Sequence, residues 1–244
     1  QSITLAPSDS DNSYASKLIS LAVRYLRASG NWDWWNSHQD TLRTIIQANV
    51  VTQIKYNGLC RVFQPPRTSA ISEYGFTMNN CEDYRGLRDF STLLNLRGQT
   101  AEAAVYLDIA HRLGQAINNL LWDSTDNGYR VSDQDLRADT RSFYPGSCCQ
   151  IFAQAFGVVE SSSHDNAAYR FLNTWSPRWP SEAYDPFPWC ILGYVAAKRG
   201  DSGRAQTQLA ATDARYQSDP GLVTINELGF YQRTRNLLQG LPDL

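Results

Sequence analysis

Features that would mark several common classes of protein are scarce in this sequence. The 244 residues carry 22 cationic and 24 anionic side chains, so the net charge is only −2. No charged run indicates a nucleic-acid-binding surface or an acidic tail. No apolar run approaches the roughly 18 residues that a membrane-spanning helix requires. We therefore expect neither a nucleic-acid partner nor a membrane span.

Motifs for cofactor and metal chemistry are also missing. The sequence contains no glycine-rich phosphate-binding loop. Its histidines, His38, His111 and His164, share no spacing that would suit a metal site, and no Ser/His/Asp or Cys/His arrangement is evident. No metal and no cofactor are therefore predicted. Lysine is scarce as well, since only Lys17, Lys55 and Lys198 are lysines among the cationic residues.

The five cysteines do not settle the cellular compartment. Cys148, Cys149 and Cys190 fall on helices that we expect to be buried, where small thiols are common. Cys60 and Cys81 lie by loops and could pair if the chain is exported, and an exported location is favoured over a cytoplasmic one. Because the chain starts at Gln1 and not at Met, we interpret it as a processed or trimmed product with a possible missing N-terminal segment.

The most informative stretch that is present runs from Tyr74 to Leu87. It reads as a loop that turns into a helix, with Asn79 or Asn80 as the N-cap. Glu82 would then lie in the first turn, where the helix dipole favours its ionised form. The amides, acids and aromatic rings of this turn suit sugar hydroxyls better than they suit a solvated helix face.

Hydrophobic periodicity predicts nine helices along the chain. Their expected ranges are 13–29, 33–54, 80–97, 100–122, 147–159, 164–174, 189–199, 202–217 and 225–238. A strand is predicted at 59–63 and a tight turn at 126–129. Short connections with Gly30, Gly98 or Gly200 follow the odd-numbered helices. The connections that follow the even-numbered helices are long and rich in aromatic, proline and acidic residues.

Odd-numbered helices are apolar on most faces, whereas even-numbered helices are amphipathic. A helix that is apolar all round is buried, and an amphipathic helix covers it. We therefore predict an all-α fold, an α/α toroid of antiparallel hairpins with inner and outer rings, in a single domain over residues 1–244. Long loops would gather at one end and form a polar, aromatic mouth. Six hairpins need twelve helices, so the toroid would be incomplete or truncated at its N-terminus.

The chain resembles the six-hairpin glycosidase superfamily of α/α toroids, and specifically the C-terminal two-thirds of such a protein. The matching motifs are Asp9-Ser10-Asp11-Asn12-Ser13-Tyr14-Ala15, Met78-Asn79-Asn80-Cys81-Glu82, Tyr84-Arg85-Gly86-Leu87, Leu121-Trp122-Asp123, Phe143-Tyr144-Pro145 and Phe187-Pro188-Trp189. The resemblance implies a carbohydrate-active protein. It also implies acids at the positions of Asn79 and Gly146, where this sequence has none.

Glycoside hydrolysis needs two carboxyl groups beside the scissile bond, and we assign these roles to Glu82 and Asp11. The residues expected to bind the saccharide are Asp9, Asn79, Asn80, Arg85, Tyr144, Trp179, Trp189 and Glu227. Plainer alternatives stay open for these residues. Asp11 would also serve as a capping acid, Glu82 and Glu227 as first-turn acids, and the aromatic rings as loop packing.

Three functions are compatible with these patterns. The leading hypothesis is a glycoside hydrolase that acts on a poly- or oligosaccharide by a two-carboxylate mechanism. The absence of acids at Asn79 and Gly146 favours the first alternative, a saccharide-binding toroid without catalytic activity. A helical-hairpin scaffold for protein interaction is the second alternative, although it leaves the aromatic mouth unexplained.

Overall fold

The computed structural model describes residues 8–243, which divide into two compact units that we describe one at a time. Within the described residues, the first unit holds 8–122, 130–136 and 156–162, and the second holds the remainder. Helices dominate both units, and the one named sheet in this part of the chain has two short strands. The all-α fold of helical hairpins is thereby confirmed.

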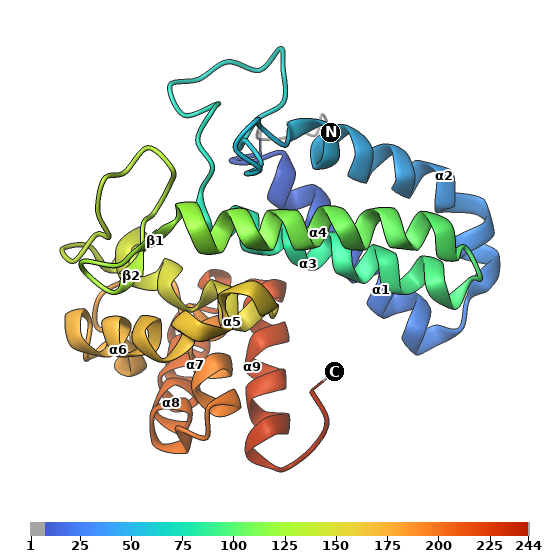
Figure 1. The fold of residues 1–244 in the computed structure, drawn as a ribbon. Coiled ribbons are helices and arrows are strands. Elements are labelled where there is room, and N and C mark those ends of the chain that lie inside the picture. The colour runs from blue at the N-terminus through green and yellow to red at the C-terminus, as the bar shows by residue number, and fades with distance from the viewer. Residues whose placement is uncertain (1–7, 244) are drawn as a thin grey trace, which may run out of the picture. The chain divides into compact units, whose positions relative to one another are not determined.

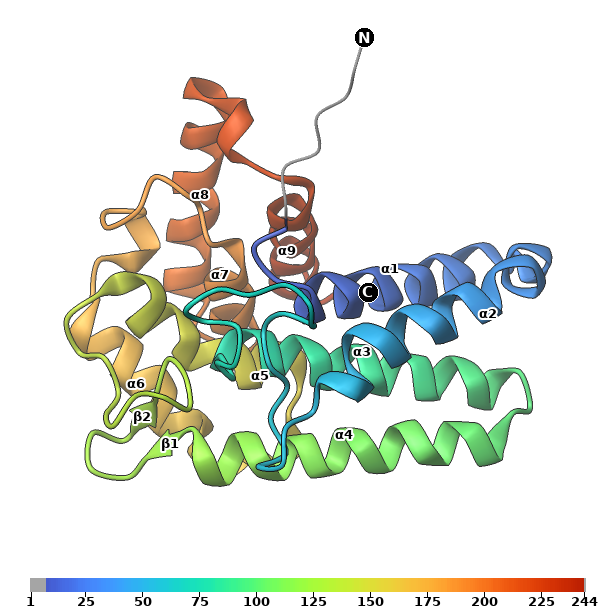
Figure 2. The ribbon, with the colours of Figure 1, turned by 90° about the horizontal axis from the view of Figure 1, so that it is seen from above.

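The first unit consists mainly of two hairpins, α1 (Asn12–Ser29) with α2 (Trp32–Asn49), and α3 (Thr77–Leu96) with α4 (Thr100–Leu120). Figures 1 and 2 show the members of each pair side by side. Gly30 and Gly98 make the tight turns because they adopt φ values of 64° and 74°, which side chains disfavour. The glycines that the sequence marked as turns do end these helices.

The α3 helix lies at the centre of the first unit. Its buried side includes Phe90 and Leu94, neither of which is exposed to solvent. The Phe90 ring lies 6.3 Å from that of Trp35, which α2 contributes to the same core. At Gly86 an added Cβ would lie 2.8 Å from the Cβ of Ser16. Glycine therefore allows the α1 and α3 backbones to approach closely.

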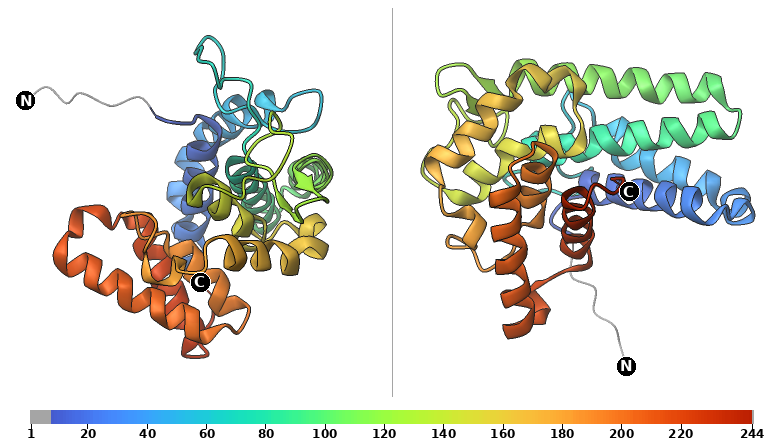
Figure 3. Two further views of the ribbon diagram at one scale, coloured as in Figure 1. Left: turned by 90° about the vertical axis from the view of Figure 1, so that its left-hand side faces the viewer. Right: turned by 90° about the horizontal axis from the view of Figure 1, so that it is seen from below.

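A tight turn between β1 (Trp122–Asp123) and β2 (Gly128–Tyr129), as predicted for residues 126–129, leads into the second unit, which begins at Asp123. Its helices are α5 (Phe152–Phe156), α6 (Asp165–Trp175), α7 (Cys190–Lys198), α8 (Ser202–Ser218) and α9 (Ile225–Leu238). In Figures 1 and 3 the helices α7, α8 and α9, coloured orange to dark red, pack as neighbours. Residues 190–196 of α7 are all buried.

Burial follows the predicted alternation for α3 and α7, but not for α1 or for α9, where Ile225 and Leu228 are exposed. Leu18, Leu21 and Tyr25 leave 45%, 65% and 42% of their surface exposed. The prediction that α1 is enclosed on most faces is therefore wrong in this structure. On α4 the predicted apolar stripe is buried at its centre, whereas Val105 and Leu120 at its ends are exposed.

The predicted strand at 59–63 is absent, and only an isolated bridge between Ile54 and Cys60 forms among these described residues. Backbone groups of this segment bond to several separate partners instead of one neighbouring strand. The Cys60 N–H donates to the Asn80 side chain, and the Val62 N–H donates to the Tyr74 carbonyl. Cys60 and Cys81 form no disulfide.

Two predicted helices are shorter than expected. The helix expected at 33–54 ends at Asn49, and Val51–Gln53 form a 3₁₀ turn in which the Gln53 side chain bonds to the Ala48 carbonyl. The helix expected at 147–159 is α-helical only over Phe152–Phe156. There the Gln150 amide donates to the carbonyls of Tyr129 and Gly146 at 2.8 and 3.0 Å. These tertiary bonds compete with regular helix bonds.

Within residues 8–243, none of the helices combines the length and the apolar character that crossing a bilayer would require.

Candidate functional site

The first group of candidate residues lies around two adjacent acids of α3, Glu82 and Asp83. The helix begins at Thr77 with Phe76 as its N-cap, so its first turn contains no acid. The predicted N-cap at Asn79 or Asn80 is therefore wrong, and Glu82 lies in the second turn. A hydrogen bond from Thr77 N–H to the Val131 carbonyl accompanies this earlier start. That partner is distant in sequence, so local capping rules cannot identify it.

Glu82 is a buried carboxyl group held by a neighbouring cation. Only 7% of Glu82 is exposed, and its Oε1 lies 3.1 Å from Nζ of Lys17. Burial raises the pKa of Glu82, although the Lys17 ammonium and the Ser13 hydroxyl oppose the rise. Desolvation thus acts against the ionised form that we expected the helix dipole to favour. Its proton is held to a higher pH than that of an ordinary glutamate.

Asp9 is the carboxylate that acts electrostatically on Glu82. It is exposed to solvent, and its negative charge contributes to the raised pKa of Glu82. The same charge is the main cause of the raised pKa of Tyr14, whose hydroxyl also bonds to Asp9. The structure thus brings Asp9, Tyr14, Lys17 and Glu82 together, with one buried and one exposed carboxyl group. We refer to these four residues as the carboxylate cluster.

Asp11, which we predicted as the second catalytic acid, has extensive contacts with the protein. Its Oδ2 accepts the Gln64 backbone N–H at 3.0 Å, and its Oδ1 lies 3.2 Å from the Arg67 guanidinium. Its side chain makes no capping bond to α1, although Asp11 is the N-cap residue. These contacts attach the start of α1 to the 55–76 loop. A catalytic role for Asp11 stays a prediction with a competing structural explanation.

Asp83 is the residue that sequence reasoning passed over. It is fully buried, and it accepts hydrogen bonds from Asn12 at 2.6 Å and Ser16 at 2.7 Å. Burial raises its pKa to about 7, against the opposing effect of these two bonds. The available signal was its position next to a candidate acid on a helix that we expected to be buried. Its partners, some 70 residues earlier in the chain, could not be inferred.

The polar residues predicted around Glu82 have different surroundings. Asn79 donates to the Asn12 side chain at 3.3 Å, next to the Asp83 bonds. Asn80 is buried and bonds to both backbone groups of Cys60, so it holds the loop in place. Arg85 pairs with Asp89 on the same helix at 2.9 Å. A saccharide-binding role for the buried Asn80 has no support in this geometry.

In the second unit, the predicted aromatic residues Tyr144 and Trp189 stack on each other. Their ring centroids are 4.8 Å apart at an interplanar angle of 27°, and 51% of Tyr144 is exposed. Trp189 has a φ of 46°, a left-handed value that is uncommon outside glycine. Its Nε1–H donates to Asp185 at 3.1 Å, which fixes the ring orientation. We call Tyr144, Trp189 and Asp185 the aromatic cluster.

Two further residues that we predicted to bind the saccharide, Trp179 and Glu227, are buried in the second unit and have structural contacts. Trp179 is 1% exposed and its Nε1–H donates to Asn173, so its ring offers no face to a sugar. Glu227 is 2% exposed and accepts the Cys190 backbone N–H, where it supports the start of α7. Glu227 does lie in the first turn of α9, and its own N–H donates to the Thr224 hydroxyl that caps that helix.

No acid could occupy position 146 in this backbone. An added Cβ at Gly146 would lie 2.5 Å from the Asp139 carbonyl oxygen and 2.9 Å from the Asp139 carboxyl carbon. Contacts this close do not occur for real Cβ atoms. Asp139 already occupies that space, and its carboxyl accepts bonds from Ser142 and from the Arg141 backbone. Among the described residues, no group of three or more His, Cys, Asp or Glu side chains could hold a metal ion.

Comparison with known proteins bears on the fold. No family model matches the chain. No curated protein matches it either. Among solved structures, it is similar to a GH78 family rhamnosidase of Bacillus sp. GL1, with a TM-score of 0.56 and 18% sequence identity. The match covers 88% of this chain and only 21% of the rhamnosidase chain. At this identity the likeness concerns the fold.

Proposed function

We propose that this protein is carbohydrate-active and hydrolyses a glycosidic bond in a poly- or oligosaccharide. The observation that carries the proposal is the carboxylate cluster, in which the buried Glu82 has a raised pKa and the charge of the exposed Asp9 contributes to it. A glycosidase needs one carboxyl group that is protonated and one that is ionised. Different environments of the two carboxyl groups would produce that division.

In this proposal Glu82 is the general acid. Burial raises its pKa, which favours the protonated form that could donate a proton to the leaving-group oxygen. Asp9 is the second carboxylate, which activates water or attacks the anomeric carbon. We propose Asp9 for this role in preference to Asp11, because both Asp11 oxygens are engaged by Gln64, Arg67 and Ser8. Lys17, whose Nζ lies 3.1 Å from Glu82 Oε1, would stabilise the carboxylate that forms once Glu82 has donated its proton.

The substrate class rests on weaker support. The rhamnosidase to which the fold is similar is named for the hydrolysis of rhamnosides, so a rhamnose-containing saccharide is the first substrate to test. In the second unit, the stacked rings of the aromatic cluster offer flat apolar surface with a polar edge, which suits the face of a sugar ring.

The test is hydrolysis of 4-nitrophenyl α-L-rhamnopyranoside and of rhamnose-containing oligosaccharides by the full-length protein. Glu82→Gln and Asp9→Asn should each lower kcat by about 10²–10⁴-fold, the usual contribution of a positioned acid or base. Asp40→Asn is the matched control, since the Asp40 side chain is 95% exposed on α2. Full activity in Glu82→Gln would refute the assignment of the acid.

A saccharide-binding protein without hydrolytic activity is the second candidate. Asn79 and Gly146 favour it, because neither position supplies an acid and position 146 has no room for one. Binding of the same oligosaccharides by the wild-type protein without any turnover would support this candidate over the first.

A further inference from the structure

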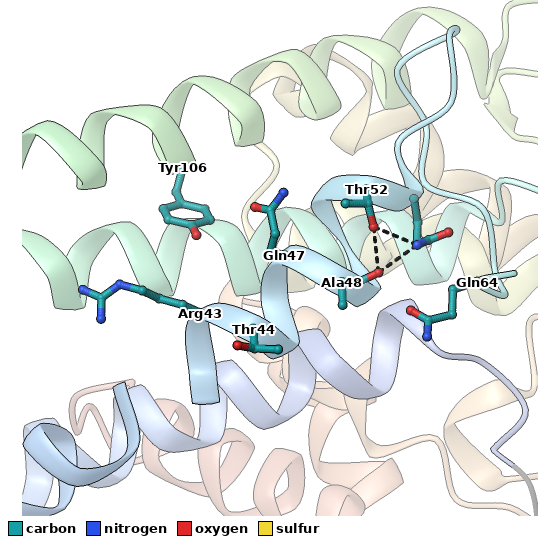
Figure 4. A pocket seen from close by; sticks show the side chains of 8 residues that line it. Arg43, Thr44, Gln47, Ala48, Thr52, Gln64 and Tyr106 are labelled. Carbon is teal, nitrogen blue, oxygen red and sulfur yellow. Dashed lines mark hydrogen bonds between the residues drawn. The ribbon is translucent and has the colours of Figure 1, made fainter. Parts of the chain in front are cut away.

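A groove lined mainly by polar residues opens on the first unit and shares no residue with the carboxylate cluster. Its volume is about 620 Å³, within the range of about 300–1,000 Å³ that is typical of ligand pockets. It is lined by residues from α2, from the 3₁₀ turn at Val51–Gln53, from the 55–76 loop and from α4 (Figure 4). They are Arg43, Thr44, Gln47, Ala48, Thr52, Gln53, Gln64 and Tyr106.

Three of the lining side chains have hydrogen-bonding capacity left over. Within residues 8–243, no hydrogen bond engages the carboxamides of Gln47 and Gln64 or the hydroxyl of Tyr106. Together these groups supply both donors and acceptors. The Tyr106 ring is held in place by the ring of Phe90 at 4.9 Å in an edge-to-face arrangement. The hydroxyl is therefore presented by a rigid ring.

The charge in the groove is already compensated. Arg43 is the one ionised residue that lines it, and both Glu102 oxygens bind its guanidinium at 2.8 and 3.0 Å. Gln39 and Gln99 bind the same guanidinium at 3.0 Å each. An anion would have to compete with these partners. The groove therefore suits a neutral ligand that exchanges many hydrogen bonds.

Hydrogen bonds within one wall of the groove hold the Gln53 side chain in place. Gln53 is 5% exposed, and its Nε2 donates to the Ala48 carbonyl at 2.7 Å and to Thr52 at 2.9 Å. Its Oε1 is buried and has no hydrogen-bond partner among the described residues. A buried unsatisfied carbonyl oxygen is costly, so this wall contains a polar group whose hydrogen bonding is incomplete.

We propose that this groove is a binding site for a neutral saccharide, with Gln47, Gln64 and Tyr106 as the residues that hydrogen-bond its hydroxyl groups. Amide and phenol groups pair well with sugar hydroxyls because both partners donate and accept. The site does not depend on the proposed hydrolysis. It would hold a chain of sugar residues on the protein whether or not the carboxylate cluster cleaves it.

The experiment is calorimetric titration with rhamnobiose, cellotetraose, galactotetraose and xylotetraose, with tetragalacturonate as the anionic comparison. It is performed on full-length protein carrying Glu82→Gln, so that no probe is consumed. Gln47→Ala and Tyr106→Phe should each weaken binding of the best neutral probe about three- to tenfold, the effect of one lost hydrogen bond. Tyr106→Phe keeps the ring against Phe90, so the fold is preserved.

Asn36→Ala provides the matched control, because Asn36 is an exposed amide on α2 outside the groove. It should leave the affinity unchanged. The proposal is overturned if no neutral probe binds, or if the groove variants bind as the parent protein does. Tighter binding of tetragalacturonate than of every neutral probe would also overturn it, because Arg43 would then act as an anion receptor. Loss of hydrolysis in Glu82→Gln with groove binding retained separates this site from the proposed catalytic one.

Discussion

The candidate residues of the two units differ in physical character. The carboxylate cluster of the first unit consists of titratable groups, and burial and the neighbouring Lys17 act in opposite directions on the pKa of Glu82. The aromatic cluster of the second unit consists of stacked rings, and a hydrogen bond to Asp185 fixes their orientation. The first arrangement is suited to moving a proton and the second to holding a ring. Substitutions in the two clusters should therefore change different measurable quantities.

The largest effect is expected where the two units are alike, in their cores. Leu94 on α3 and Leu192 on α7 are 0% and 1% exposed. Leu94→Ala and Leu192→Ala should each lower the free energy of unfolding by about 2–5 kcal/mol, because each leaves a cavity in a packed interior. Chemical denaturation measures this loss. Leu18→Ala, at the 45% exposed Leu18 of α1, is the control and should cost much less. Equal midpoints for Leu18→Ala and Leu94→Ala would show that α3 is not enclosed.

The next effect concerns pH and comes from Asp83, a buried group of the first unit. The pKa of Asp83 is about 7 in the folded protein and 3.8 for an ordinary aspartate. Between these values the unfolded chain has released the proton that the folded chain keeps. The contribution of Asp83 to the free energy of unfolding is therefore fully present below about pH 4. It falls as the pH rises towards 7. The slope is at most about 1.4 kcal/mol per pH unit.

Asp83→Asn should remove that slope, because an amide does not ionise in this range. Denaturation at pH 5, 6, 7 and 8 compares the variant with wild type. Asp108→Asn is the control, since the Asp108 side chain is 66% exposed. If wild type and Asp83→Asn lose stability in parallel as the pH rises, Asp83 does not carry the buried proton.

The smallest effect is expected in the aromatic cluster. Trp189→Ala should raise the Kd of a bound saccharide about tenfold, because a stacking platform contributes binding. Trp175→Ala, at a tryptophan of α6 that is 51% exposed, is the control. A drop in kcat comparable to that of Glu82→Gln would remove the distinction between the two clusters.

Local signals in the sequence predicted the helices well. Helix α9 begins and ends where the periodicity places it, at Ile225 and Leu238, and α8 differs by one residue. Glycines at positive φ mark the hairpin turns. These features depend on residues within a few positions of each other, so no knowledge of the tertiary structure was needed.

The candidate site was less predictable, because contacts between distant segments determine it. Asn80 was interpreted as a cap and instead binds the backbone of Cys60, 20 residues earlier. The partners that hold Asp83 lie on α1. Burial of Glu82, which raises its pKa, depends on the packing of α1 against α3 and has no signature in its own turn. The choice between Asp9 and Asp11 likewise depends on the 55–76 loop.

The scarcity of lysine makes the ion pair of Lys17 accessible to amine-selective labelling. Lys55 is 9% exposed at its side chain and is paired with Asp133, which leaves Lys17 and Lys198 as the exposed side-chain amines. Reductive methylation with ¹³C-formaldehyde would place isotopic methyl groups on very few positions, one of them next to the Glu82 carboxyl group. The chemical shift of that label would follow the protonation of Glu82 directly, without any substitution in the carboxylate cluster.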